Sequence, residues 1–194
     1  IVMAASDESE LVKMVNTSVN INDRPSAFRY PRGSGLGIEL PDINETIEIG
    51  KGRIISQGKH VAILNFGGRL NECKKASETL KKKGITTSIF DARFAKPLDE
   101  RLIIELASNH DAIISIEEGS IGGFGSHVSK LLSDRGFFDK GLKFRSMILP
   151  DKFLDQDTPE NMYKNAGLDA NSIVDRIESI LNSNVVIAKN KNLS

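Results

Sequence analysis

Apolar positions between residues 50 and 182 alternate between two spacings. Short, nearly continuous apolar runs, typical of buried strands, are followed by longer stretches in which apolar residues recur every three or four positions, as on one face of a helix. This alternation predicts a three-layer α/β domain: a mostly parallel sheet with helices on both faces. The expected strands are 52–56, 59–66, 86–90, 112–116 and 143–149, and the expected helices are 69–83, 126–134 and those capped by Asp99, Thr158 and Asp169.

Two details of this pattern carry further expectations. The first two strands are separated by the turn Gln57-Gly58, which predicts a β-hairpin and hence one antiparallel edge strand. The segment 91–98 reads as a long charged loop after a strand. In the helix 69–83, an apolar stripe of Leu70, Cys73, Ala76 and Leu80 is expected to face the core.

Residues before 50 follow a different pattern. Ser6-Asp7-Glu8 supplies side-chain acceptors and negative charge that favour a helix start. The expected helix has Leu11, Met14, Val15 and Val19 on its apolar face and is followed by a strand at 26–30 that Pro31 ends. We therefore divide the chain into 1–38, a linker at 39–49, a domain at 50–182, and a tail at 183–194 that is frayed apart from a short contact by 185–187.

The amino-acid composition excludes several classes of function. The 194 residues are 39% hydrophobic and 27% charged, and 26 basic residues balance 26 acidic ones, so no charge excess favours a nucleic-acid partner. No apolar run approaches the ~20 residues of a membrane span. The single Cys73 excludes an intrachain disulfide. The chain begins without a methionine or a signal-peptide pattern, and we expect it to start inside a larger protein.

The stretch 117–126 joins a strand to a helix through four glycines, at the place where α/β sheets carry functional loops. Its spacing matches neither the dinucleotide nor the P-loop motif. In the simpler interpretation, Ser126 caps the helix and Glu117 and Glu118 accept backbone N–H groups or face water. In the functional one, the loop packs against a partner chain or against a ligand of another domain, and Phe124 would supply the contact with the partner.

Other candidates divide between chemistry and structure. Asp91, Arg93 and Lys96 alternate in charge and are interpreted as a salt-bridge cluster at the sheet rim. Arg32, between Pro31 and Gly33, has the guanidinium fork that binds phosphate, and the alternative is an ordinary ion pair on the surface. His60, His110 and His127 lack metal-ligand spacing, His110 suits a helix C-terminus, and Cys73 is expected in the core rather than as a nucleophile.

The chain resembles the 1-deoxy-D-xylulose-5-phosphate synthases of the transketolase superfamily. The motifs that carry the resemblance follow family order from the N-terminus to about residue 182. They are 26–33 (SAFRYPRG), 50–52 (GKG), 64–67 (LNFG), 91–99 (DARFAKPLD), 117–119 (EEG), 122–126 (GGFGS), 149–151 (LPD) and 167–170 (GLDA). The resemblance covers the last third of such an enzyme. It implies that 1–38 ends a thiamine pyrimidine-binding domain and that 50–182 is a transketolase C-terminal-like domain.

The same resemblance implies a function for the whole protein. These enzymes condense pyruvate with glyceraldehyde 3-phosphate, with loss of CO2, using thiamine diphosphate and Mg2+, and the product feeds isoprenoid, thiamine and pyridoxal synthesis. Arg32 matches the arginine that holds the substrate phosphate, and Tyr30 and Arg29 lie near it in sequence. The G-D-G…N motif for diphosphate and metal and the activating glutamate are absent from this chain, so we expect no catalytic residue, bound cofactor, metal or activity in the chain alone.

Two alternatives remain open. The C-terminal half of a transketolase or of a 2-oxoacid dehydrogenase β subunit would share the fold, although the sequence of residues 29–33 argues against both. A free-standing α/β interaction module would dock onto separate subunits. In the leading interpretation the whole protein is a homodimer in the cytoplasm, or in the plastid of a plant, with no nucleic-acid or membrane partner.

Overall fold

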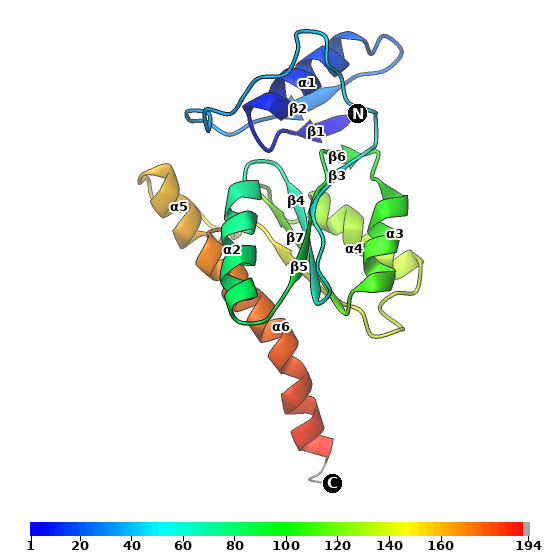
Figure 1. The fold of residues 1–194 in the computed structure, drawn as a ribbon, viewed down its shortest axis with the longest axis vertical. Coiled ribbons are helices and arrows are strands. Elements are labelled where there is room, and N and C mark those ends of the chain that lie inside the picture. The colour runs from blue at the N-terminus through cyan, green and yellow to red at the C-terminus, as the bar shows by residue number, and fades with distance from the viewer. Residues whose placement is uncertain (192–194) are drawn as a thin grey trace.

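The computed structural model describes the backbone of residues 1–191 and the side chains of residues 1–182. A five-stranded sheet in the order β3-β5-β4-β7-β8 runs between two helical layers, and a three-stranded sheet in the order β2-β1-β6 lies with α1 at one end of the molecule (Figure 1). The elements are β1 (Val2–Ala4), α1 (Glu8–Val19), β2 (Ala27–Arg29), β3 (Arg53–Ser56), β4 (Val61–Phe66), α2 (Leu70–Lys82), β5 (Thr87–Asp91), β6 (Phe94–Lys96), α3 (Glu100–Asn109), β7 (Ala112–Glu117), α4 (Phe124–Asp134), β8 (Lys143–Met147), α5 (Pro159–Asn165) and α6 (Ala170–Lys191).

The larger sheet confirms the predicted α/β class. β5, β4, β7 and β8 are parallel, and β3 is the one antiparallel strand, at the edge. Successive side chains of a strand point to opposite faces. Ile63, Ile89 and Ile114 therefore pack toward α2 and α6, whereas Leu64 and Ile113 pack toward α3 and α4. Figure 1 shows the two helical layers on either side of the sheet.

The predicted hairpin is wrong, although the antiparallel edge strand that it implied is present. β3 pairs with β5, with Arg53 opposite Asp91, and β4 lies between β5 and β7. The reason is burial: every residue of β4 is buried, so this strand needs a neighbour on each side. The connection from β3 to β4 instead passes the start of β5, where the backbone N–H of His60 donates to the carbonyl of Thr86 (3.1 Å).

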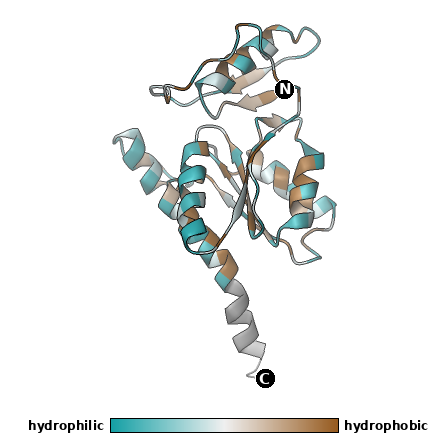
Figure 2. Ribbon diagram, viewed as in Figure 1, coloured by the Kyte–Doolittle hydropathy of each residue, from teal (hydrophilic) through white to brown (hydrophobic). Residues whose placement is uncertain are grey.

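Most of the predicted helix boundaries are confirmed. Asp99 accepts the backbone N–H of Leu102 (3.2 Å), and the caps at Thr158 and Asp169 form in the same way. The apolar stripe of α2 is buried as expected, and most of the α2 surface visible in Figure 2 is hydrophilic. The helix α6 continues to Lys191, where a frayed tail was expected from residue 183. The expected contact by 185–187 lies outside the described side chains.

The smaller sheet joins distant parts of the chain. β1 pairs in parallel with β2 and antiparallel with β6, which lies inside the segment expected to be a charged loop. The apolar face predicted for α1 is partly wrong: Val15 and Val19 are exposed, and Glu10 is buried in their place. The cause is that α1 turns Glu10 toward two arginines described below. Residues 39–49 contain no strand or helix, and the division of the chain at this linker remains a prediction.

Candidate functional site

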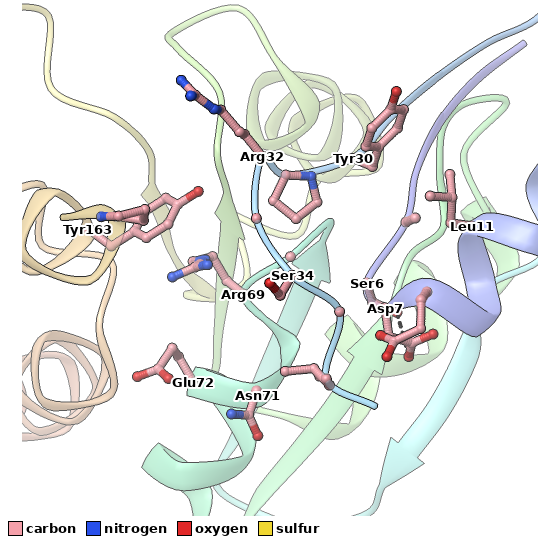
Figure 3. Close-up of a pocket in the computed structure, with 18 residues that line it drawn as sticks. Ser6, Asp7, Leu11, Tyr30, Arg32, Ser34, Arg69, Asn71, Glu72 and Tyr163 are labelled. Atoms are coloured by element: carbon pink, nitrogen blue, oxygen red, sulfur yellow. Dashed lines mark hydrogen bonds between the residues drawn. The ribbon is translucent and has the colours of Figure 1, made fainter. Parts of the chain in front are cut away.

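The Arg32 cavity lies where the two sheets meet and has a volume of about 750 Å3. One wall is the segment 30–36 that follows β2, another is the start of α1, and the start of α2 and one side of α5 complete it (Figure 3). The lining residues are Ala5, Ser6, Asp7, Glu8, Leu11, Tyr30, Pro31, Arg32, Gly33, Ser34, Gly35, Leu36, Gly68, Arg69, Asn71, Glu72, Pro159 and Tyr163. Such a concave space at the ends of parallel strands is the expected place for a ligand.

Arg32 and Tyr30 both line the rim of this cavity and are exposed to solvent. In Figure 3 their side chains extend from the loop away from Asp7 and Glu72. Within the described residues, the Arg32 guanidinium has no hydrogen bond or ion pair. Its five donors are therefore available to an anion.

Arg29 does not line the Arg32 cavity. Its guanidinium donates to the carbonyls of Phe66 (3.3 Å) and Glu118 (3.2 Å), and Nη2 lies 3.6 Å from Glu117 Oε2. The guanidinium carbon also lies 4.8 Å from the centre of the Phe66 ring. These contacts connect the end of β2 to the ends of β4 and β7, so the position of Arg29 is explained by packing between the two sheets.

Two glutamates at the end of β7, Glu117 and Glu118, contact a backbone N–H group and a neighbouring arginine. Glu117 is buried and accepts the backbone N–H of Gly125 (2.9 Å), as the simpler interpretation predicted. A Cβ on Gly123 would lie 2.6 Å from Glu117 Oε2, so a larger residue here would displace the Glu117 carboxylate. Glu118 instead pairs with Arg69 at 2.8 Å, and the Arg69 guanidinium stacks 3.5 Å from the Tyr163 ring centre on the wall of the Arg32 cavity.

Two expectations for this glycine-rich stretch are wrong. Gly123, not Ser126, is the N-cap of α4, and the Ser126 hydroxyl accepts the backbone N–H of Gly122 (3.0 Å). Phe124 is only 1% exposed and stacks on Phe66 with ring centres 4.9 Å apart. Burial of this ring in the chain's own core starts the helix earlier and removes Phe124 as a partner contact.

A junction cluster of five charged residues connects α1 to β3, β5 and the segment before β6. It consists of Asp7, Glu10, Arg53, Asp91 and Arg93. Arg53 contacts all three carboxylates, at 3.0 Å to Asp7, 3.1 Å to Glu10 and 3.0 Å to Asp91, and Arg93 forks onto Glu10 at 2.6 and 2.9 Å. Burial raises the pKa of the Asp91 carboxyl, and the charge of Arg53 opposes that shift.

This cluster confirms a salt-bridge interpretation for Asp91 and Arg93, although their partners come from α1 and β3. Lys96 is exposed on β6 and takes no part in it. The partners were not predictable from the local charge pattern, because Glu10 and Arg93 are far apart in the sequence.

The remaining candidates have structural positions. His110 contacts the carbonyl of Leu106 (2.9 Å) at the end of α3, as expected for a helix C-terminus. His60 bonds Thr86, and His127 is exposed beside a smaller cavity that Arg29 also lines. Cys73 is fully buried, and this burial raises the pKa of its thiol, which fits the predicted core position.

Three residues of the Arg32 cavity were not singled out from the sequence. Glu8 reads as an ordinary residue of a helix start, and no spacing indicates that it contacts a loop. Arg69 directly follows Gly67-Gly68 at the end of β4, a joint at which functional residues gather, so that position was a usable signal. Tyr163 lies on α5 and is brought to Arg69 only by the tertiary fold.

The fold and the site define an α/β domain that carries a ligand-sized cavity at its junction with a second, smaller sheet. Residues 50–173 match the family model described as "Transketolase, C-terminal domain", and the chain belongs to this family. Enzymes of this family generally use thiamine diphosphate and a divalent metal.

Solved structures agree with this assignment. The chain is similar to a split gene transketolase described as an inactive β4 tetramer, with 25% identity, a TM-score of 0.78, and coverage of 92% of this chain and 56% of that one. It also shares its fold with the H261F mutant transketolase from Pichia stipitis (13%, TM-score 0.66, 92% and 24% covered) and with transketolase from Campylobacter jejuni subsp. jejuni NCTC 11168 (16%, TM-score 0.62, 92% and 26% covered). The chain spans little more than half of the first of these proteins and about a quarter of the other two.

The described residues contain no group of three or more histidine, cysteine or acidic side chains arranged to hold a metal ion. The junction cluster brings several acidic side chains together, but its carboxylates are paired with Arg53 and Arg93. We therefore assign no step of cofactor chemistry to this part of the chain. No helix that the structure describes combines the length and the apolar character needed to cross a membrane.

Proposed function

We propose that this chain is the C-terminal part of a 1-deoxy-D-xylulose-5-phosphate synthase and that Arg32 holds the phosphate of glyceraldehyde 3-phosphate. The observation that carries the proposal is the Arg32 guanidinium, exposed at the rim of a cavity of about 750 Å3 and without a partner among the described residues. Tyr30 lies on the same rim. A planar fork of donors matches a phosphate better than it matches a neutral sugar.

In this proposal the whole protein joins a two-carbon unit from pyruvate to the aldehyde, and the carboxyl group of pyruvate leaves as CO2. Thiamine diphosphate, when bound with Mg2+, stabilises the electron pair that decarboxylation leaves behind. Arg32 contributes by holding the phosphate, which is remote from the reacting carbonyl and orients the aldehyde. We further propose that the whole protein is a cytoplasmic homodimer and that this chain alone is inactive.

The test is an assay of the full-length protein with thiamine diphosphate and Mg2+, in which CO2 release from carboxyl-labelled pyruvate is followed with and without glyceraldehyde 3-phosphate. We expect release to depend on the aldehyde and a five-carbon sugar phosphate to form in equal amount. Release that is unaffected by the aldehyde, with no sugar product, would reject the assignment.

The second candidate is a transketolase, favoured by the TM-score of 0.78 to the split gene transketolase over 92% of this chain. A transketolase moves a two-carbon unit between sugar phosphates and releases no CO2. The same preparation, supplied with a ketose phosphate donor and an aldose phosphate acceptor in place of pyruvate, separates the two: transfer between sugars supports the transketolase, and inactivity with these substrates supports the synthase.

A further inference from the structure

Arg32 lies on a segment with few contacts, the 31–40 loop. All ten of its residues are exposed. Within the described residues, its only hydrogen bonds are made by one side chain, Glu8, at the first position of α1. Beyond its connection to β2, the conformation of this loop therefore depends on the hydrogen bonds to Glu8.

The contact with Glu8 is specific. Glu8 Oε1 accepts the backbone N–H of Gly37 at 2.5 Å and that of Ile38 at 3.1 Å. Gly37 has a φ of 75°, a left-handed conformation that favours glycine. A Cβ on Gly35 would lie 2.7 Å from Glu8 Oε1, so the loop is also shaped to admit this carboxylate.

The charge state suits this role. Hydrogen bonding to the loop backbone, at Leu36 above all, lowers the pKa of the Glu8 carboxyl. The group therefore remains ionised near neutral pH, where an ionised acceptor binds backbone N–H groups more strongly than a neutral one. Glu8 and Arg32 line the same cavity, from α1 and from the loop.

We infer that Glu8 is a positioning residue: its hydrogen bonds to Gly37 and Ile38 fix the 31–40 loop so that Arg32 presents its guanidinium at the cavity rim. Pro31 and the end of β2 hold the loop on one side of Arg32, and Glu8 holds it on the other. This inference rests on the proposed role of Arg32 in binding phosphate.

Simple electrostatics predicts the opposite effect for Glu8. A carboxylate near Arg32 repels a phosphate, so removing it would strengthen binding if charge alone mattered. Positioning predicts that removing Glu8 weakens binding, because an unrestrained loop must be ordered again each time the substrate binds. The sign of the change in KM for glyceraldehyde 3-phosphate therefore separates the two.

The experiment uses the full-length enzyme with Glu8→Ala, Glu8→Asp and Glu8→Gln. We expect Glu8→Ala to raise KM for the aldehyde about tenfold and to leave KM for pyruvate within twofold. Glu8→Asp keeps the charge at the helix start but is one methylene too short, and it should behave like Glu8→Ala. Glu8→Gln keeps the length and one acceptor oxygen and should restore part of the loss. Glu39→Ala, an exposed glutamate of the same loop, is the matched control and should leave both values unchanged.

Two further readouts separate failure of this inference from failure of the proposed function. In an Arg32→Ala background, Glu8→Ala should have no added effect on KM, since positioning acts through Arg32. Hydrogen exchange at Gly37 and Ile38 should speed up in Glu8→Ala whatever the enzyme's substrate. Unchanged exchange, a lower KM, or fully additive effects would overturn the inference. Faster exchange together with an Arg32→Ala variant of normal KM would instead reject the phosphate-binding role of Arg32 and, with it, the positioning role.

Discussion

Replacing Arg53 by methionine is expected to be the most damaging single change at the junction of the two sheets. The Arg53 guanidinium bonds Asp7, Glu10, Asp91 and the hydroxyl of Ser6, all at 3.0 to 3.1 Å. Methionine keeps much of the aliphatic packing and removes the charge. Glu10 retains Arg93, whereas Asp91 retains, among the side chains that the structure describes, only the hydrogen bonds from Ser6 and Asn65.

The magnitude follows from the burial of the carboxylate that loses its partner. The Asp91 side chain is fully buried, and removal of one partner of a buried ion pair typically costs about 3–5 kcal/mol. Arg53 itself is partly exposed, so the lower part of this range is expected. The matched control is Arg135→Met: the pair of Arg135 with Glu100 lies on the surface, and loss of such a pair costs about 0–1 kcal/mol.

The pH dependence gives the prediction a second, independent test. Burial raises the pKa of Asp91 above its ordinary value of 3.8, and loss of Arg53 removes the charge that opposes this rise. A carboxyl whose pKa is raised in the folded state contributes stability that is complete below its unfolded pKa and is lost as the pH rises through its folded pKa. The stability difference between Arg53→Met and wild type should therefore be largest at neutral pH and shrink as the pH falls and the Asp91 carboxyl takes up a proton.

The assay is urea unfolding of this chain, followed by circular dichroism, for wild type and both variants at several pH values. Limited proteolysis within 1–49 reports whether the smaller sheet detaches first. The reasoning is refuted if Arg53→Met costs no more than Arg135→Met, or if its cost stays constant between neutral and acidic pH.

Three further outcomes are expected. Arg32→Ala in the full-length enzyme should lower kcat/KM for glyceraldehyde 3-phosphate by about one to two orders of magnitude, given ~1.5–3 kcal/mol for each charge-assisted hydrogen bond, with Arg32→Lys recovering part; steady-state kinetics within twofold of wild type would contradict this. Phe124→Ala should cost about 3–5 kcal/mol in urea unfolding because the ring is buried against Phe66, while Ile121→Ala, on the exposed part of the same loop, should stay within about 0.5 kcal/mol; equal costs would count against it. Calorimetry of this chain alone should detect no binding of thiamine diphosphate with Mg2+, and saturable binding at micromolar cofactor would reverse that expectation.

The sequence predicted those parts of the fold that depend on local pattern. Burial of the α2 stripe, the cap at Asp99 and the run of β4 follow from residues within a few positions of one another. The failures share one cause, which is competition from distant contacts. β3 pairs with β5 and not with β4, which follows it in the sequence. The helix α4 starts at Phe124, earlier than predicted, because the Phe124 ring is buried against Phe66.

The candidate site shows the same division. Arg32 was singled out because Pro31 and Gly33 flank it in a glycine-rich loop and because it matches the phosphate-binding arginine of the family that the chain resembles. Glu8 was not, because its significance comes from Gly37 and Ile38, which meet it only after the chain has folded back over α1. Arg29 lies three residues before Arg32 and was also a candidate for the site. Its contacts with Phe66 and Glu118 could be known only from the structure.

The pairing of β1 with β6 has a consequence for dividing the gene. A cut at residues 39–49 looks harmless, since these residues contain no strand or helix, yet it separates β1 and β2 from β6, the third strand of their sheet. Each piece would expose an unpaired strand edge that fits the other piece. Two such pieces expressed separately are expected to associate, because β6 pairs with β1 and because Glu10 and Arg93 carry opposite charges. The junction is therefore a natural position for a split-protein reporter whose signal reads reassembly.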